Sequence, residues 1–213
     1  MKSTNAVKSA GALALALTVG TSLGWAGTPP PSQLAASWWN WALEVPAAQS
    51  PLLDTTGDFA AVGQSGPVWF LAGNFGGTSV RTFTVPPGKP MFFPVANTFA
   101  GGFLKPGGFG PDPVANAREL CAEGMAAVTS LVCDVDGVSI PITEQNLEKS
   151  TVFALRLPAN NIFQEAPMTV PATVDEGYYV LLAPLAPGQH TIHFATTSSS
   201  GFSLDVTDHI TVQ

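Results

Sequence analysis

The sequence predicts a mainly β protein, a two-layer antiparallel β-sandwich of the jelly-roll type with two accessory helices. The chain has 213 residues, of which 21 are Gly and 19 are Pro, and this density of helix breakers excludes a helical bundle. From residue 63 onward, apolar residues recur with period two between Gly- and Pro-rich turns, the spacing typical of half-buried strands. Apolar residues make up 46% of the chain, enough for a substantial core.

The first 26 residues have the pattern of a secretory signal peptide. Lys2 and Lys8 precede an apolar run, and the small residues Gly24 and Ala26 stand before a cleavage position at Gly27. A retained N-terminal anchor is the alternative. We therefore expect a signal peptide over residues 1–26, a leader with a Trp-rich helix over 27–58 and a sandwich over 59–213. The protein would be secreted or periplasmic, with no membrane span in the mature chain.

The charge balance narrows the range of partners. Lys and Arg number 8 against 15 Asp and Glu, for a net charge of -7. An acidic chain has no basic surplus with which to neutralise phosphates, so nucleic-acid binding is not expected.

A Trp-rich helix is predicted over residues 32–44, with Ser32 as its N-cap and Pro46 ending it. The helix carries Trp38, Trp39 and Trp41. Two interpretations remain open for these rings: the helix plugs one end of a β core, or the rings form an aromatic platform for a sugar or another flat ligand.

The platform hypothesis makes Trp38, Trp39, Trp41 and Trp69 the candidate ligand-binding residues, beside the Gly- and Pro-rich loop over residues 100–111. A glycan-binding platform should leave at least two of these rings coplanar and exposed to water. The plug hypothesis predicts buried rings instead.

The remaining elements follow from turn signals and alternation. A second helix is predicted from Asp112, its cap, to about residue 127, and Asp136-Gly137 predicts a tight hairpin. Strands are predicted over 68–73, 80–85, 91–95, 151–157, 168–174, 178–185, 190–196 and 202–212.

The chain has two cysteines, which an exported protein would meet in an oxidising environment. Cys121 lies on the second predicted helix, and Cys133 lies on the strand that follows it. A disulfide between them would join helix to sheet, and two separate buried thiols are the alternative.

The strongest catalytic candidates lie on the last two strands. A turn centred near Ser199 would place His193 opposite Asp205 and His190 opposite Asp208. Asp208 falls on an apolar face and needs a partner, either His190 or Arg81. A structural Arg-Asp pair is favoured over an acid-base site made of Arg81, His190, His193 and Asp208.

Metal and cofactor sites are not expected. Asp134 and Asp136 flank the predicted hairpin turn, and Asp54 and Asp58 flank another turn. Carboxylate oxygens of this kind can bind calcium, but neither pair belongs to a loop with enough ligands for a calcium site. The hydrogen bonds that aspartates form in turns explain both pairs.

Five groups of motifs follow one another along the chain. They are Trp38-Trp39-Asn40-Trp41, Gly63-Gln64 with 68–73, Pro87-Gly88-Lys89 with Phe92-Phe93-Pro94, Val135-Asp136-Gly137, and Pro187-Gly188-Gln189-His190 with Ile192-His193-Phe194. In this order they resemble a family of uncharacterised exported bacterial and archaeal proteins that has no assigned activity. The resemblance covers nearly all of the mature chain, implies an exported single-domain β protein and adds no catalytic residue.

From the sequence we expect a non-enzymatic binding or cell-surface protein, with a glycan or an envelope protein as its partner. Two alternatives are kept: a secreted polysaccharide hydrolase or lyase, and a self-assembling extracellular subunit. The enzyme should bring Arg81, Asp208 and a histidine together in an open cleft, whereas the subunit should leave an unpaired edge strand.

Overall fold

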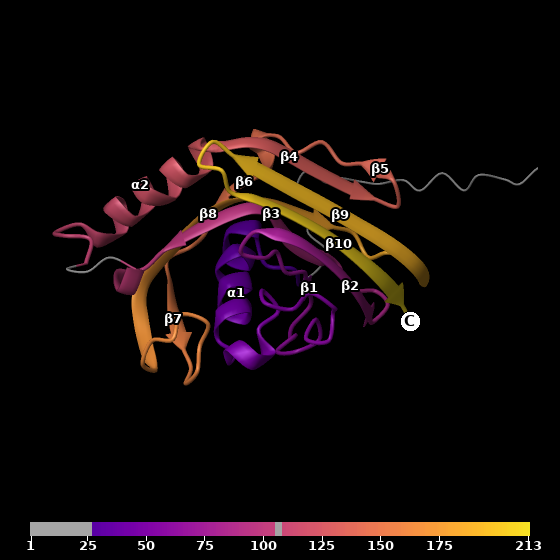
Figure 1. Ribbon diagram of the computed structural model, residues 1–213, viewed down its shortest axis with the longest axis horizontal. Helices are drawn as coiled ribbons and strands as arrows, with labels where there is room; N and C mark the ends of the chain where they lie inside the picture. Colours follow the sequence, from indigo (N-terminus) through magenta and orange to yellow (C-terminus); the bar gives the residue numbers. More distant parts are fainter. Residues whose placement is uncertain (1–26, 105–107) are drawn as a thin grey trace, which may run out of the picture.

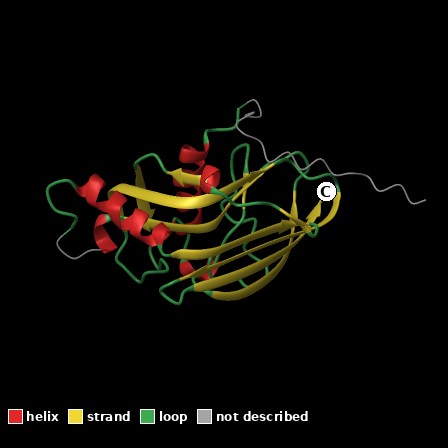
Figure 2. Cartoon of the chain, turned by 90° about the horizontal axis from the view of Figure 1, so that it is seen from above, coloured by secondary structure: helices red, strands yellow, loops and turns green. Residues whose placement is uncertain are grey.

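A computed structural model describes residues 27–104 and 108–213, and the signal-peptide prediction for residues 1–26 lies outside these ranges. The protein is a mainly β sandwich of two five-stranded sheets with two α-helices, as the sequence predicted. Figure 2 shows the two sheets as separate layers. Within the described ranges, no helix combines the length and the apolar character needed to cross a membrane.

The first sheet, sheet A, has the order β1-β3-β8-β6, and β7 also pairs with β8. Its strands are β1 (Trp69–Phe70), β3 (Met91–Ala100), β6 (Leu147–Lys149), β7 (Phe153–Leu157) and β8 (Met168–Leu182). The strands predicted over 168–174 and 178–185 are one long strand in the structure. Ala172, with a φ of 55°, bends this strand where its pairing with β7 shifts register.

The second sheet, sheet B, has the order β2-β10-β9-β4-β5. Its strands are β2 (Gly77–Val85), β4 (Val128–Val135), β5 (Val138–Ser139), β9 (Gly188–Ser198) and β10 (Ser203–Val212). Most pairs are antiparallel, as predicted, but β1 with β3 and β2 with β10 are parallel. Asp136 and Gly137 both have positive φ, which confirms the predicted hairpin turn between β4 and β5.

Helix α1 (Pro31–Leu43) lies under the arch of sheet A, and α2 (Pro113–Ala126) lies on the opposite side of that sheet (Figure 1). Asp112 caps α2 as predicted, since its carboxylate accepts the backbone N–H of Ala115. The predicted Ser32 cap is wrong: α1 begins at Pro31, and no side chain caps it. Short 3-10 helices occur at Ala47–Gln49, Gly102–Leu104 and Glu144–Asn146.

Two large apolar clusters hold the layers together. One lies between the sheets and includes Phe93 of β3 and Phe194 of β9, whose ring centroids are 5.2 Å apart. The other packs α1 against the opposite face of sheet A and includes Trp38, Phe92 and Leu155. The predicted N-terminal segment, 27–58, therefore shares a hydrophobic core with the predicted sandwich, 59–213.

The predicted disulfide is wrong, because Cys121 and Cys133 are both free and buried. Cys121 packs in a third cluster between α2 and β8, with its Sγ 3.8 Å from the carbonyl oxygen of Val174. Cys133 belongs to the cluster between the two sheets. The two thiols are thus built into separate parts of the core.

Burial predicts that both thiols resist chemical reagents. It raises the pKa of each thiol to about 12, so the reactive thiolate is scarce at neutral pH. A thiol reagent such as Ellman's reagent is expected to modify neither cysteine in the native protein and both after denaturation. An unfolded chain with no reactive thiol would contradict the structure.

Candidate functional site

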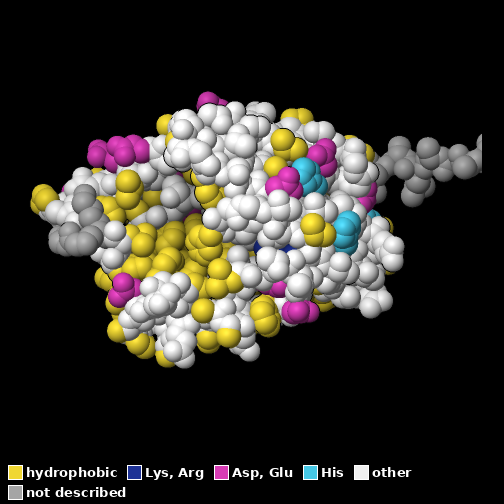
Figure 3. All heavy atoms as spheres, in the orientation of Figure 1, with side chains coloured by type: hydrophobic (Ala, Val, Ile, Leu, Met, Phe, Trp, Pro, Cys, Tyr) yellow, Lys and Arg dark blue, Asp and Glu magenta, His cyan; other side chains and the backbone are white. Residues whose placement is uncertain are grey.

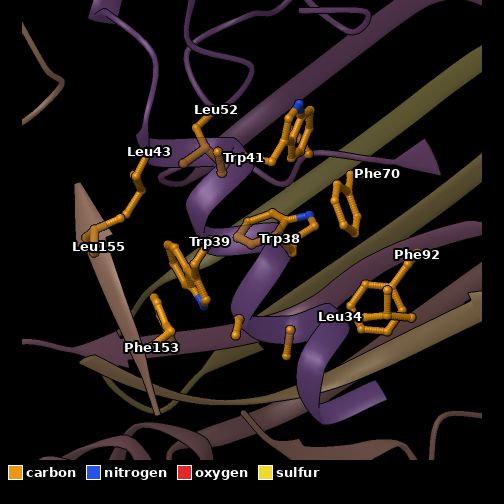
Figure 4. Close-up of a cluster of buried hydrophobic side chains, with 14 of the residues drawn as sticks. Leu34, Trp38, Trp39, Trp41, Leu43, Leu52, Phe70, Phe92, Phe153 and Leu155 are labelled. Carbon is orange, nitrogen blue, oxygen red and sulfur yellow. The ribbon is translucent and has the colours of Figure 1, made fainter. Parts of the chain in front are cut away.

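The three tryptophans of α1 are buried, as the plug interpretation predicts, but α1 covers the outer face of sheet A and does not close an end of the core between the sheets. Trp38, Trp39 and Trp41 are 1%, 5% and 7% exposed. Their rings are not coplanar: Trp38 makes interplanar angles of 88° with Trp39 and 64° with Trp41. Figure 4 shows Trp38 between the other two rings, with Trp39 directed towards Phe153 and Trp41 near Phe70. The structure therefore forms no water-exposed platform from these rings.

Each of these indole N–H groups donates a hydrogen bond within the protein. Trp38 donates to the carbonyl of Leu71 at 2.8 Å, and Trp41 donates to the carbonyl of Val62 at 2.7 Å. Trp69, on β1, lies between the sheets and is 7% exposed. The four predicted ligand-binding tryptophans are thus core residues, and Trp41 is the one that also borders a groove.

Arg81 and Asp208 pair as the sequence suggested, but in the interior of the protein. They face one another in the register of β2 and β10, and Arg81 Nη1 lies 3.6 Å from Asp208 Oδ1. The guanidinium also donates to the carbonyl oxygens of Asp54 at 2.8 Å, Gly73 at 2.7 Å and Ala72. The cavity beside the pair measures about 10 Å³, too small for a sugar ring.

The histidines do not join this pair. The predicted register is wrong by two residues: His193 faces Thr207 and His190 faces Ile210. The turn is centred one residue later than expected, because the loop closes with the Ser198 N–H donating to the carbonyl of Phe202.

The histidines instead bind aspartates near the surface. His190 Nδ1 lies 2.7 Å from Asp136 Oδ2, and its Nε2 lies 2.8 Å from the carbonyl of Ala186. These bonds to Asp136 and Ala186 raise the pKa of His190, outweighing the desolvation that opposes them. His193 lies between Asp134, at 3.5 Å, and Asp205, at 3.3 Å. The structure does not assemble Arg81, Asp208 and a histidine in one cleft.

Asp54 and Asp58 form hydrogen bonds within their own turn, as the turn interpretation predicts, whereas the aspartates of the β4–β5 hairpin contact histidines. Asp54 Oδ1 accepts the backbone N–H groups of Thr56 and Gly57, and Oδ2 accepts that of Phe59. These bonds lower the pKa of Asp54 despite the desolvation that opposes them. Across the described part of the chain, no three His, Cys, Asp or Glu side chains are arranged to hold a metal ion.

A buried carboxyl that the sequence analysis missed lies between α1 and sheet A. Asp175 Oδ2 accepts hydrogen bonds from Trp39 Nε1 at 2.6 Å and from the Tyr179 hydroxyl at 3.0 Å. Burial raises the pKa of Asp175 to about 8. The sequence placed Asp175 between two predicted strands, 168–174 and 178–185, so it gave no sign that this residue lies on a buried face of β8.

A groove of about 500 Å³ lies between α1 and the segment 63–70. Ser37, Asn40 and Glu44 line it from one side of α1, where helical spacing places them in a row. Trp41 and Phe70, with ring centroids 5.6 Å apart, contribute apolar surface. We call this site the α1 groove.

Asn40 and Glu44 differ in how their oxygen atoms are hydrogen-bonded within the protein. Asn40 Oδ1 is buried and has no hydrogen-bond partner within the protein. Glu44, the C-cap of α1, uses Oε1 to accept the backbone N–H of Arg156 at 3.1 Å. Asn40, with its unpartnered amide oxygen, and Glu44, with its carboxylate, thus line the same side of the groove.

The opposite wall is fixed by Gln64, which the sequence analysis quoted only as part of a motif. Its Nε2 donates to the carbonyls of Ala60 and Phe70, and its Oε1 accepts the backbone N–H of Phe70. These bonds tie the segment 60–70 into a closed loop. The groove thus lies between α1 and a hydrogen-bonded loop, although the sequence predicts no helix or strand over residues 60–67.

A second surface feature lies on the other side of α1. Trp39 and Phe99 have ring centroids 4.3 Å apart, and Phe99 in turn contacts Phe103 and Phe163, which are partly buried. Figure 3 shows apolar side chains gathered in one area, where Figure 1 has the space between α2 and β7. Phe103 of this aromatic surface belongs to the predicted loop contact region, of which the structure describes residues 100–104 and 108–111.

Comparisons with protein-family models, with curated proteins and with solved structures find no match for this chain.

Proposed function

We propose that this protein is a non-enzymatic binding protein that holds a short glycan, or a similar hydroxyl-rich ligand, in the α1 groove. The observation that carries the proposal is the buried, unpartnered Oδ1 of Asn40 in a groove of about 500 Å³. A buried acceptor without a partner costs free energy, which a ligand hydroxyl would recover by donating to it.

The size and mixed lining of the groove support this ligand class. Sites for small molecules measure roughly 300–1,000 Å³ and combine apolar walls with a few placed polar groups. The C–H face of a sugar can pack on the rings of Trp41 and Phe70. Its hydroxyls can donate hydrogen bonds to Asn40 and Glu44.

The arrangement of the acid-base candidates supports binding rather than catalysis. Arg81 and Asp208 are enclosed in the core, with side chains 2% and 1% exposed. His190 and His193 contact Asp136, Asp134 and Asp205 instead.

We also propose that binding takes place outside the cytoplasm, in the periplasm or beyond the cell. The pattern of residues 1–26, with Lys2 and Lys8 before an apolar run and small residues at 24 and 26, supports export. A glycan of the cell envelope would then be within reach of the groove.

Replacing Asn40 with leucine tests the binding site. Leucine keeps the branched shape of the side chain but removes the acceptor, so glycan affinity is expected to fall by about tenfold, the value of one hydrogen bond. A glycan array identifies the sugars that bind, and calorimetric titration then measures the dissociation constant for the wild type and for Asn40→Leu.

The matched control is Gln33→Ala, an exposed change on α1 away from the groove lining. It should leave the affinity unchanged. Absence of glycan binding, or equal binding by the wild type and Asn40→Leu, would refute the proposal.

A further inference from the structure

Two acceptors line the α1 groove beside the hydroxyl groups of Ser37 and Ser65. Asn40 offers an unpartnered amide oxygen, and Glu44 offers a carboxylate. A ligand that meets both must bring donors, and the hydroxyls of a sugar supply them. A ligand carboxylate would instead bring a negative charge against the carboxylate of Glu44.

Glu44 is the one charged side chain among the described residues that line the groove. The backbone N–H of Arg156 holds Glu44 Oε1 at 3.1 Å, so the carboxylate keeps its place at the end of α1. Among the described residues, no cationic side chain forms an ion pair with Glu44. Its negative charge therefore acts on whatever enters the groove.

Lys89 is the cation that approaches the groove from the opposite wall. Its Nζ donates to the carbonyl of Gly66, a lining residue, but Lys89 does not itself line the groove. The acidic charge of Glu44 is thus presented directly to a ligand, whereas the ammonium of Lys89 is directed to a backbone carbonyl.

We propose that the α1 groove selects uncharged sugars and that Glu44 rejects acidic ones. This inference rests on the proposed glycan-binding function and adds the charge class of the ligand. The hydroxyls of a neutral sugar donate to Asn40 and Glu44, and a uronate in the same position meets the like charge of Glu44.

Matched pairs of trisaccharides test this selectivity: glucose, galactose and mannose trimers against the corresponding uronate trimers. For the wild type, each uronate trimer is expected to bind about tenfold more weakly than its neutral counterpart, and added salt should narrow the difference. Glu44→Gln should close most of that difference, and it should also weaken neutral binding, because an amide oxygen accepts a sugar hydroxyl less strongly than a carboxylate does. Glutamine retains the oxygen that accepts the Arg156 N–H, so the variant should fold normally.

Uronates that bind as tightly as neutral trimers, or an unchanged ratio in Glu44→Gln, would overturn the selectivity. Lys89→Gln is the second variant, and a loss of uronate binding there would show that acidic sugars enter from the opposite wall. A different outcome is that the wild type binds neutral and acidic sugars equally while Asn40→Leu binds both more weakly. That outcome would support the glycan-binding proposal and refute the proposed charge selectivity. If no trimer and no array glycan binds, the proposed function itself is overturned.

Discussion

Replacing Arg81 with alanine is expected to lower the free energy of unfolding by about 3–5 kcal/mol, the cost of breaking a buried ion pair. The guanidinium, 2% exposed, binds the carboxylate of Asp208 and the backbone carbonyls of Asp54, Ala72 and Gly73. Alanine would leave this carboxylate and these carbonyls unpaired inside the protein. Urea-induced unfolding, followed by Trp fluorescence, measures the loss.

The exposed Arg156 provides the matched control, since Arg156→Ala keeps the backbone N–H that binds Glu44. It should change stability by less than about 0.5 kcal/mol. The double variant Arg81→Met/Asp208→Leu removes both charges and should be more stable than Arg81→Ala, since apolar residues can replace a buried ion pair. An Arg81→Ala protein as stable as Arg156→Ala would show that the buried pair contributes nothing.

Stability is expected to fall as pH rises from about 4 to about 8, and Asp175 is expected to cause a large part of the fall. Burial raises the pKa of Asp175 to about 8, outweighing the lowering by Trp39, Tyr179 and Arg118, while Glu176 raises it further. The folded state then binds a proton that the unfolded chain releases near its ordinary pKa of about 3.9. The contribution is complete below that value and is lost as pH approaches 8, with a slope of at most about 1.4 kcal/mol per pH unit.

Asp175→Asn should reduce this pH dependence, because an amide stays neutral and its oxygen can still accept from Trp39 and Tyr179. Glu119→Gln, on the exposed side of α2, is the matched control and should keep the wild-type pH profile. Comparing the three proteins at pH 5, 7 and 9 isolates Asp175 from other groups such as Asp208, whose pKa burial also raises. A profile that is the same for Asp175→Asn and the wild type would refute the role of Asp175.

The buried side chains of Arg81 and Asp175 both hold segments that form the walls of the α1 groove. Arg81 holds the carbonyls of Asp54, Ala72 and Gly73, on either side of the segment that forms one wall, and Gln64 closes that segment upon itself. Asp175 receives the indole N–H of Trp39 and so fixes α1, which forms the other wall. The groove therefore depends on polar contacts in the core that lie outside its own lining.

The fold class and most of the elements could be predicted because they depend on local patterns. The alternation of apolar and polar residues identified β2, β9 and β10. Asp112 marked the start of α2, and Asp136-Gly137 marked the hairpin between β4 and β5. The burial of the tryptophans was one of two interpretations, since three adjacent aromatic residues suit either a core or a platform.

The sites could not be predicted in the same way, because they join segments that are distant in the chain. The pairing of Trp39 with Asp175 spans 136 positions, and the contact of Glu44 with the Arg156 N–H spans 112. The disulfide prediction failed for the same reason: the sequence placed Cys121 on a helix and Cys133 on a strand, but not in separate parts of the core.

The sequence alone determined that this chain forms a β-sandwich with two helices, because hydrophobic periodicity and turn residues act over short stretches and need no partner. The tertiary structure alone decided which polar side chains are enclosed and which face solvent. A side chain's environment is set by strands and helices that meet across the fold, so the buried Arg81 and Asp175 and the open groove beside Asn40 emerge only when the layers pack.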